Sequence, residues 1–194
     1  MKLDRIFEFL RLLHAFQQVK RRVFANGEDR LENDAEHSYQ LAMAAWYLIE
    51  SGNLPLDKGK AMRYALVHDL VEVYAGDTYV HAPEEERRGK AEREAEALKR
   101  LEGEFPECAG LFEAIHMYEK REDAESRFVY ALDKAIVPMN LYLDGGRTWR
   151  AHGVTFKMVL ENKTDKVKVS PEIEKIFYEV LALLETEKDK LFPV

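Results

Sequence analysis

The chain has 194 residues, of which 46% are hydrophobic and 34% charged, a balance typical of a soluble globular protein that excludes a disordered chain. The length favours one domain over residues 1–194 with a sizeable core. The formal net charge of −7 argues against a broad nucleic-acid-binding surface, because such a surface needs an excess of Lys and Arg. A local basic patch for one phosphate is still compatible with this charge.

The sequence also bears on the compartment. Its single cysteine, Cys108, excludes an internal disulfide and fits a reducing compartment. Residues 1–11 are interrupted by charges every few positions, unlike the apolar core of a signal peptide. The longest apolar run, residues 41–49, is far below the roughly 18 residues that a membrane span needs. We expect a cytoplasmic protein that does not associate with membranes.

Apolar residues at helical spacing predict an amphipathic first helix from about residue 3 to about residue 23. It ends in the basic run Lys20, Arg21 and Arg22. This run is either a solvated last turn that complements the helix dipole, or one of its arginines turns inward to hold an anion. The sequence leaves both interpretations open.

Residues 26–35 are polar and predict a loop before the second helix. Asn33 or Asp34 is placed to cap that helix, which runs to a stop at about residue 52. A third helix is predicted to begin near Asp57.

The third predicted helix carries the most unusual stretch of the chain, residues 64–78. Its apolar face contains His68, Asp69 and Glu72, and Asp77 follows a glycine that is a natural helix stop. Ionisable side chains in so apolar a segment are costly to bury unless they are paired or bound to a metal. Helical spacing places Glu72 beside the His-Asp pair. This arrangement indicates an active site.

The remaining segments predict a loop or flap over the site and further helices. The flap covers residues 78–89, and the helices cover about residues 90–102, 111–118, 128–143 and 148–162 and a final segment from Pro171. The helix at 128–143 is strongly apolar and carries one internal aspartate, Asp133. Since no segment alternates convincingly at period two, the predicted fold is all-α, an irregular helical bundle.

Four side chains with metal-ligand chemistry lie on three predicted helices: His37, His68, Asp69 and Asp133. Each is weak evidence alone, since a lone histidine on an apolar helix face is more often a hydrogen-bonded core residue, and Asp133 alone could form a structural ion pair. The combination is more specific, because each polar insertion accounts for the others. Such a site would be assembled by the fold and not by a local loop.

These residues resemble the H…HD…D signature of the HD-domain metal-dependent phosphohydrolases. The matching motifs are His37 in Glu-His-Ser, His68-Asp69 in Val-His-Asp-Leu-Val-Glu, and Asp133 in Ala-Leu-Asp-Lys. Glu72, three residues after the His-Asp pair, and the following Gly-Asp at Asp77 are most similar to the 5′-deoxynucleotidase branch. The resemblance runs from the first helix to about Asp133 and is specific over residues 33–77.

The resemblance implies that one divalent cation is bound by His37, His68, Asp69 and Asp133. Two imidazoles and two carboxylates favour Mn²⁺ or Co²⁺ ahead of Zn²⁺, Fe²⁺ or Mg²⁺. The resemblance also implies that Glu72 and Asp77 are catalytic carboxylates, that Arg22 binds the substrate phosphate, and that the protein is a homodimer. Val23 stands where bacterial members carry an aromatic residue after that arginine.

The implied reaction is removal of the 5′-phosphate from (deoxy)nucleoside monophosphates, small-molecule substrates and not nucleic-acid polymers. Glu72 or Asp77 would activate the attacking water, and the sequence leaves open which one does so. One alternative is another HD phosphohydrolase reaction, on a hyperphosphorylated guanosine or a cyclic diester. A second is a helical binding module without catalysis. The presence of Glu72 and Asp77 beside all four potential ligands favours an enzyme.

Overall fold

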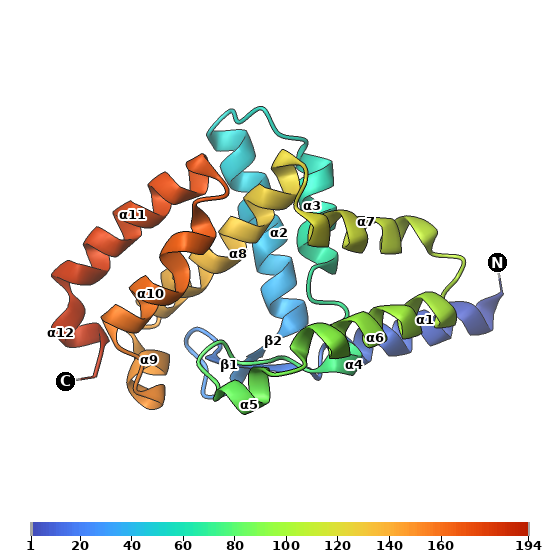
Figure 1. Ribbon diagram of the computed structural model, residues 1–194, viewed down its shortest axis with the longest axis horizontal. Helices are drawn as coiled ribbons and strands as arrows, with labels where there is room; N and C mark the ends of the chain where they lie inside the picture. Colours follow the sequence, from blue (N-terminus) through green and yellow to red (C-terminus); the bar gives the residue numbers. More distant parts are fainter. Residues whose placement is uncertain (1, 194) are drawn as a thin grey trace.

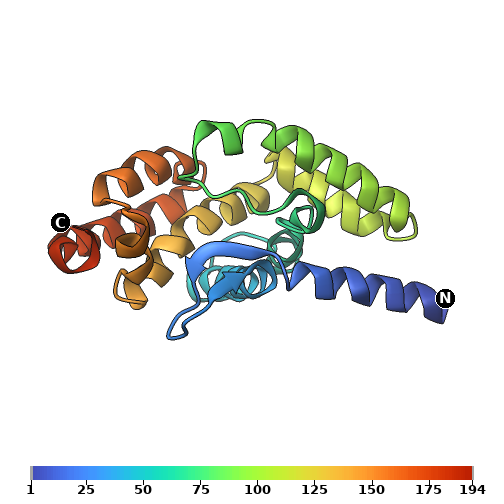
Figure 2. The same ribbon diagram turned by 90° about the horizontal axis from the view of Figure 1, so that it is seen from below.

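Helices make up most of the computed structural model, which describes residues 2–193 except for the side chain of Glu86 (Figures 1 and 2). The helices are α1 (Leu3–Phe16), α2 (Asp34–Ser51), α3 (Lys58–Val67), α4 (Glu72–Ala75), α5 (Glu84–Arg87), α6 (Lys90–Glu104), α7 (Ala109–Lys120), α8 (Ala124–Leu143), α9 (Arg147–His152), α10 (Phe156–Val167), α11 (Pro171–Thr186) and α12 (Lys188–Leu191). The strands β1 (Lys20–Phe24) and β2 (Leu31–Asn33) form a small antiparallel pair. The predicted all-α class is confirmed, with this pair as its one addition among the described residues.

Helix α8 lies at the centre of the main bundle, in contact with α2, α3, α7, α10 and α11 (Figure 1). It is central because apolar side chains cover much of its surface; Phe128, Val129, Leu132 and Ile136 are buried. Asp133 is 5% exposed among them, so the helix carries a carboxylate into the interior. The bundle thus places one potential ligand at its core.

The start of α2 is fixed by a capping box, which confirms the predicted cap. The side chain of Asn33 accepts a hydrogen bond from the N–H of Glu36 at 3.0 Å, and the Glu36 carboxylate accepts one from the N–H of Asn33 at 3.1 Å. This cap places His37 in the first turn of α2, facing inward and fully buried.

The predicted extension of the first helix to residue 23 is wrong. Helix α1 ends at Phe16, and the basic run lies on β1, with Lys20 opposite Asn33 and Phe24 opposite Leu31. β-branched and aromatic residues at the end of this segment favour a strand, and Gly27, with φ +74°, supplies the left-handed turn of the hairpin. Arg22 therefore stands on a strand beside the site and not at a helix end.

The predicted third helix is divided in two. Helix α3 ends at Val67, and α4 begins at Glu72. The Nδ1 of His68 lies 2.8 Å from the carbonyl of Ala65, the group that would accept the next helical bond, and the backbone continues with i→i+3 bonds such as Glu72 N–H to Asp69 carbonyl at 2.9 Å. The tighter turn still keeps Glu72 on the same side as the His-Asp pair.

The segment after Asp77, predicted as a loop or flap, contains the short helix α5, and its residues 78–80 and Arg87 line the cavity described below. The Tyr79 ring connects this segment to α9, with its centroid 5.6 Å from that of His152. The helix predicted over residues 148–162 is interrupted at Gly153, whose φ of +64° ends α9. Helix α10 then packs along α8 (Figure 1).

Within residues 2–193, no helix combines the length and the apolar character needed to cross a membrane.

Candidate metal and phosphate site

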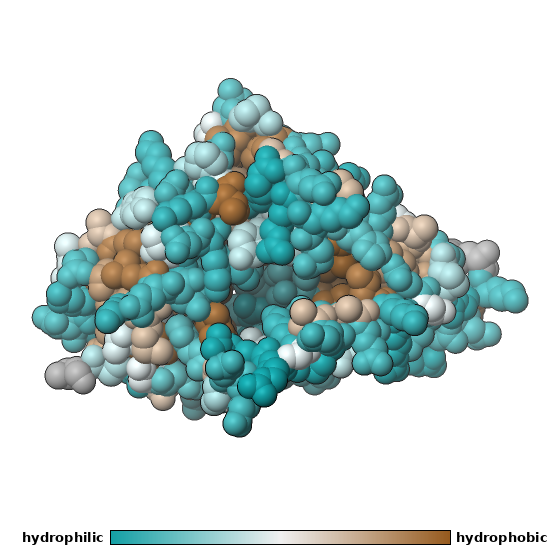
Figure 3. Space-filling model, viewed as in Figure 1, coloured by the Kyte–Doolittle hydropathy of each residue, from teal (hydrophilic) through white to brown (hydrophobic). Residues whose placement is uncertain are grey.

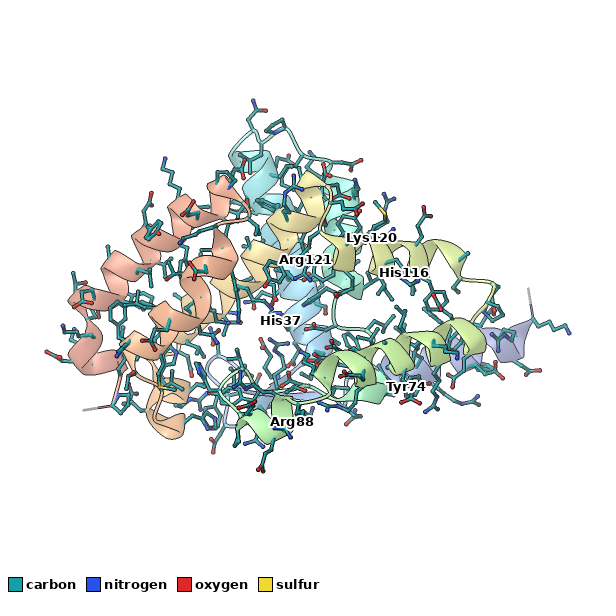
Figure 4. All side chains as sticks on the ribbon, viewed as in Figure 1. His37, Tyr74, Arg88, His116, Lys120 and Arg121 are labelled. Atoms are coloured by element: carbon teal, nitrogen blue, oxygen red, sulfur yellow. The ribbon has the colours of Figure 1, made fainter. Side chains whose placement is uncertain are left out.

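The four predicted metal ligands converge in the structure, although they come from three separate parts of the chain. His37 Nε2 lies 3.0 Å from Asp133 Oδ1, and His68 Nε2 lies 3.0 Å from Asp69 Oδ2 and 4.0 Å from Asp133 Oδ1. One ligand atom from each of His37, His68 and Asp69 falls within 4.8 Å of the others. Figure 4 shows His37 near the middle of the molecule, whereas Tyr74 and His116 lie towards one side. Their role as metal ligands stays a prediction.

The surroundings of the His68 ring are compatible with a bound cation. His68 Nδ1 faces a backbone carbonyl at 2.8 Å and must therefore carry the proton, which leaves a lone pair on Nε2. That lone pair faces a carboxylate oxygen at 3.0 Å, and Nε2 is buried without a hydrogen bond. Two acceptors this close require a proton or a cation between them. The donor set therefore suits a divalent metal.

A second group of carboxylates adjoins the first and adds Asp34, which the sequence did not indicate as a site residue. Asp34, Asp69 and Glu72 each place an oxygen within 4.8 Å of the others. Asp34 is fully buried, although in the sequence it reads only as a helix cap. Its position one helical turn before His37 is the signal that could have identified it.

Crowding of these carboxylates shifts their pKa values. Burial, followed by the charge of Asp69, raises the pKa of Glu72 to about 10 and that of Asp34 to about 7. Burial also raises the pKa of Asp77. Burial opposes the ionisation of Asp133 as well, but the charge of the adjacent Lys134 and the two histidines together outweigh burial and lower its pKa. The site thus separates carboxyl groups that hold protons from carboxylates that stay ionised.

One arginine of the basic run turns inward, as one of the two sequence interpretations expects, and it is Arg21. Its Nη1 donates to Asp69 Oδ2 at 3.0 Å and to Asp34 Oδ1 at 3.4 Å, and its Nε lies 3.2 Å from Glu32. These carboxylates of the protein occupy the guanidinium group. Arg21 therefore holds the carboxylate cluster together and leaves the neighbouring Arg22 for other contacts.

A cavity of about 380 Å³ opens beside the cluster. Its lining includes Asp69, Glu72, Asp77 and Asp133, together with Arg22, so the structure brings the predicted catalytic and phosphate-binding residues to one space. Figure 3 shows a recess near the middle of the molecule, rimmed largely by hydrophilic residues. Lys90, whose Nζ lies 3.6 Å from Glu72 Oε1, contributes to the same wall. The catalytic role of Asp77 and the phosphate-binding role of Arg22 stay predictions.

The fold and site define an all-α protein with a buried histidine–aspartate cluster at a cationic cavity. The profile of the HD domain matches residues 13–174, so the chain belongs to the HD-domain family.

Relatives with assigned activities match part of the chain. The human 5′-deoxynucleotidase HDDC2 is 34% identical over 135 residues, which cover 66% of this chain and 63% of that protein. The yeast 5′-deoxynucleotidase YGK1 is 27% identical over 133 residues, covering 65% of this chain and 60% of that protein. The chain thus spans less than two thirds of the length of these relatives.

Solved structures match nearly the whole chain. A crystal structure of a predicted metal-dependent phosphohydrolase from Magnetospirillum magnetotacticum has a TM-score of 0.82 and 30% identity, covering 98% of this chain and 96% of that one. The PH0347 protein from Pyrococcus horikoshii, at 23% identity and a TM-score of 0.66, shares the fold over 91% of this chain and 99% of its own. The likeness therefore includes α10 and α11, beyond the motifs seen in the sequence.

Proposed function

We propose that the protein is a metal-dependent phosphohydrolase that removes the 5′-phosphate from (deoxy)nucleoside monophosphates. The observation that carries this proposal is the convergence of His37, His68, Asp69 and Asp133 beside a cavity that also contains Glu72, Asp77 and Arg22. The names of the human and yeast relatives support nucleotides as the substrate class.

The four converging residues, two histidines and two aspartates, would hold one divalent cation, with Mn²⁺ or Co²⁺ favoured over Zn²⁺, Fe²⁺ or Mg²⁺. When bound, the cation would lower the pKa of water and of nearby carboxyl groups and would polarise a phosphoryl oxygen. The unpartnered Nε2 of His68 is the buried ligand atom that supports this assignment.

The side chains of the cavity account for the remaining parts of a phosphomonoester hydrolysis. Glu72 has one carboxylate oxygen near Lys90 and the other without a hydrogen bond, so the free oxygen can take a proton from water. Asp77, whose pKa is raised by burial, suits proton delivery to the leaving ribose oxygen. Arg22 would bind the oxygens of the phosphoryl group. We assign water activation to Glu72 on the basis of its free oxygen.

A substrate panel tests the proposal. Purified protein, loaded in turn with Mn²⁺, Co²⁺, Zn²⁺, Fe²⁺ and Mg²⁺, is assayed for phosphate release from deoxynucleoside and ribonucleoside monophosphates. A hyperphosphorylated guanosine and a cyclic dinucleotide are included as competing substrates. We expect release from monophosphates only. Turnover of the competing compounds alone would overturn the substrate assignment, and a protein that binds no metal would favour the helical binding module.

We also propose that the protein acts as a homodimer in the cytoplasm. The exposed face of α2 carries Tyr39, Met43, Trp46 and Tyr47, with exposed fractions of 42–70% for the three aromatic residues, and a second copy would bury this apolar face. The single cysteine supports a reducing compartment. Light scattering of the purified protein measures the oligomeric state, and a monomer at micromolar concentration would contradict the proposed homodimer.

A further inference from the structure

The wall of the cavity that comes from α10 has no assigned role. Asn162, Lys163 and Lys166 of this helix line the cavity. Lys166 donates to Asn162 Oδ1 at 3.3 Å, which leaves the amide N–H groups of Asn162 available. The polar groups of these three side chains that have no partner in the protein are therefore hydrogen-bond donors.

The cations of the cavity divide into two groups. Arg21, Lys90 and Lys134 each face a carboxylate of the cluster: Asp69 at 3.0 Å, Glu72 at 3.6 Å and the adjacent Asp133, respectively. Lys163 belongs to the other group: among the residues that the structure describes, which exclude the side chain of Glu86, it forms no hydrogen bond or ion pair. Lys163 therefore has no carboxylate as a direct partner, although the charge of Asp133 acts on it from a distance.

This imbalance is costly in the free protein. Lys163 is only partly exposed, and burial, followed by the charge of Lys134, lowers its pKa to about 7. Burial and the charge of Lys134 also lower the pKa of Lys166. Like charges held together in a partly buried space are stabilised when an anion joins them.

We infer that Lys163, with Lys166 and the amide of Asn162, forms an anion subsite on α10 that binds a phosphoryl group. This inference deepens the proposed function and rests on it for the identity of the nucleotide. The lysine ammonium groups and the amide offer several donors to one small anion, the arrangement that phosphate oxygens accept. The phosphoryl group is either the one that is hydrolysed or a second one on the same nucleotide.

Binding of inorganic phosphate to the metal-loaded protein tests the subsite without requiring turnover. Isothermal titration compares the natural protein with Lys163→Met and with Lys157→Met, a matched control because Lys157 lies on the same helix with its side chain 81% exposed. Loss of one charge-assisted hydrogen bond is expected to weaken phosphate binding by about tenfold to a hundredfold in Lys163→Met. Lys157→Met is expected to bind phosphate as the natural protein does.

Stability measurements separate the subsite from a structural role. Removal of an unbalanced charge should leave the Tm of the phosphate-free Lys163→Met protein equal or higher, and Lys163→Arg should retain most of the phosphate affinity. Equal phosphate affinity in folded Lys163→Met and in the natural protein would overturn the inference. If Lys163→Met does not fold, Lys166→Met is titrated in its place, and unchanged affinity there has the same meaning.

Kinetics then identify which phosphoryl group is bound. KM is measured for a deoxynucleoside 5′-monophosphate and for the corresponding 3′,5′-bisphosphate with the natural protein and with Lys163→Met. An increase of KM for both substrates identifies the hydrolysed phosphate, and an increase for the bisphosphate alone identifies a second phosphate. If no nucleotide is hydrolysed, the proposed function fails, whereas weakened phosphate binding by Lys163→Met still supports the subsite.

Discussion

Replacement of Glu72 by Gln separates chemistry from metal binding. Glu72 is 3% exposed, is absent from the group formed by His37, His68 and Asp69, and has one oxygen without a hydrogen bond. Glutamine has the same shape but accepts no proton, so the change removes a general base and leaves the packing intact. General-base catalysis contributes about a hundredfold to ten-thousandfold, or about 2.7–5.5 kcal/mol of transition-state stabilisation. We expect a loss of kcat within this range.

The assay measures phosphate release together with the metal content of the same sample. Glu94→Gln is the matched control, because Glu94 lies 3.2 Å from the same Lys90 that faces Glu72, but Glu94 does not line the cavity. We expect the control to retain its activity. A metal-replete Glu72→Gln protein with kcat within threefold of the natural enzyme would refute the role of Glu72.

The same substitution has a stability consequence of known sign. Because burial raises the pKa of Glu72 to about 10, the metal-free folded state binds a proton that the unfolded state releases above its ordinary pKa of about 4.3. Stability of the metal-free protein therefore falls as the pH rises through this window. Glutamine does not ionise, so the metal-free Glu72→Gln protein should have a Tm at pH 7 equal to or above that of the natural protein.

Three further substitutions test other parts of the account. Asp69→Ala should lose bound metal by elemental analysis and lose turnover; full metal content would remove Asp69 from the ligand set. Arg22→Ala should raise KM for the monophosphate by about tenfold or more, with metal content unchanged, and an unchanged KM would contradict phosphate binding by Arg22. Asp123→Ala removes the cap of α8, whose carboxylate accepts from Ser126 N–H at 2.7 Å, and should cost about 1–2 kcal/mol in urea unfolding at pH 7. Burial opposes the ionisation of Asp123, but the hydrogen bonds from Ser126, Tyr64 and Lys60 together lower its pKa. The stability difference should therefore shrink as the pH falls below about 4, and a constant difference would exclude a contribution from the ionised carboxylate.

The sequence predicts the local elements of the site well because each depends on nearby residues. The capping box of Asn33, the proline at the start of α11 and the Gly76 stop after α4 are all short-range signals, and the structure contains each of them. The bond between His37 and Asp133 joins residues 96 apart, and only their shared chemistry could indicate it. The shared metal-ligand chemistry of His37 and Asp133 thus predicts a contact that their spacing in the sequence does not.

The features missed from the sequence are those that depend on partners far along the chain. The residues of β1 continue the amphipathic pattern of α1, and the local preference of Val23 and Phe24 for a strand decides the structure only together with the pairing to β2. Lys163 reads as a solvated lysine on an amphipathic helix until α10 is placed against α8.

The distribution of charge within the cavity explains why two adjacent arginines have different roles. Burial opposes the charge of Arg21, but the surrounding carboxylates, of which Asp69 acts most strongly, together outweigh burial and raise its pKa, so Arg21 remains a permanent counter-ion for the cluster. Replacing it would leave buried carboxylates without their partner, a structural cost that is independent of any substrate. Arg22, on the neighbouring strand position, forms no ion pair within residues 2–193 and lines the open part of the cavity. The protein's own carboxylates therefore neutralise the partly buried Arg21, whereas the exposed Arg22 keeps an unpaired positive charge at the cavity, as its proposed role in phosphate binding requires.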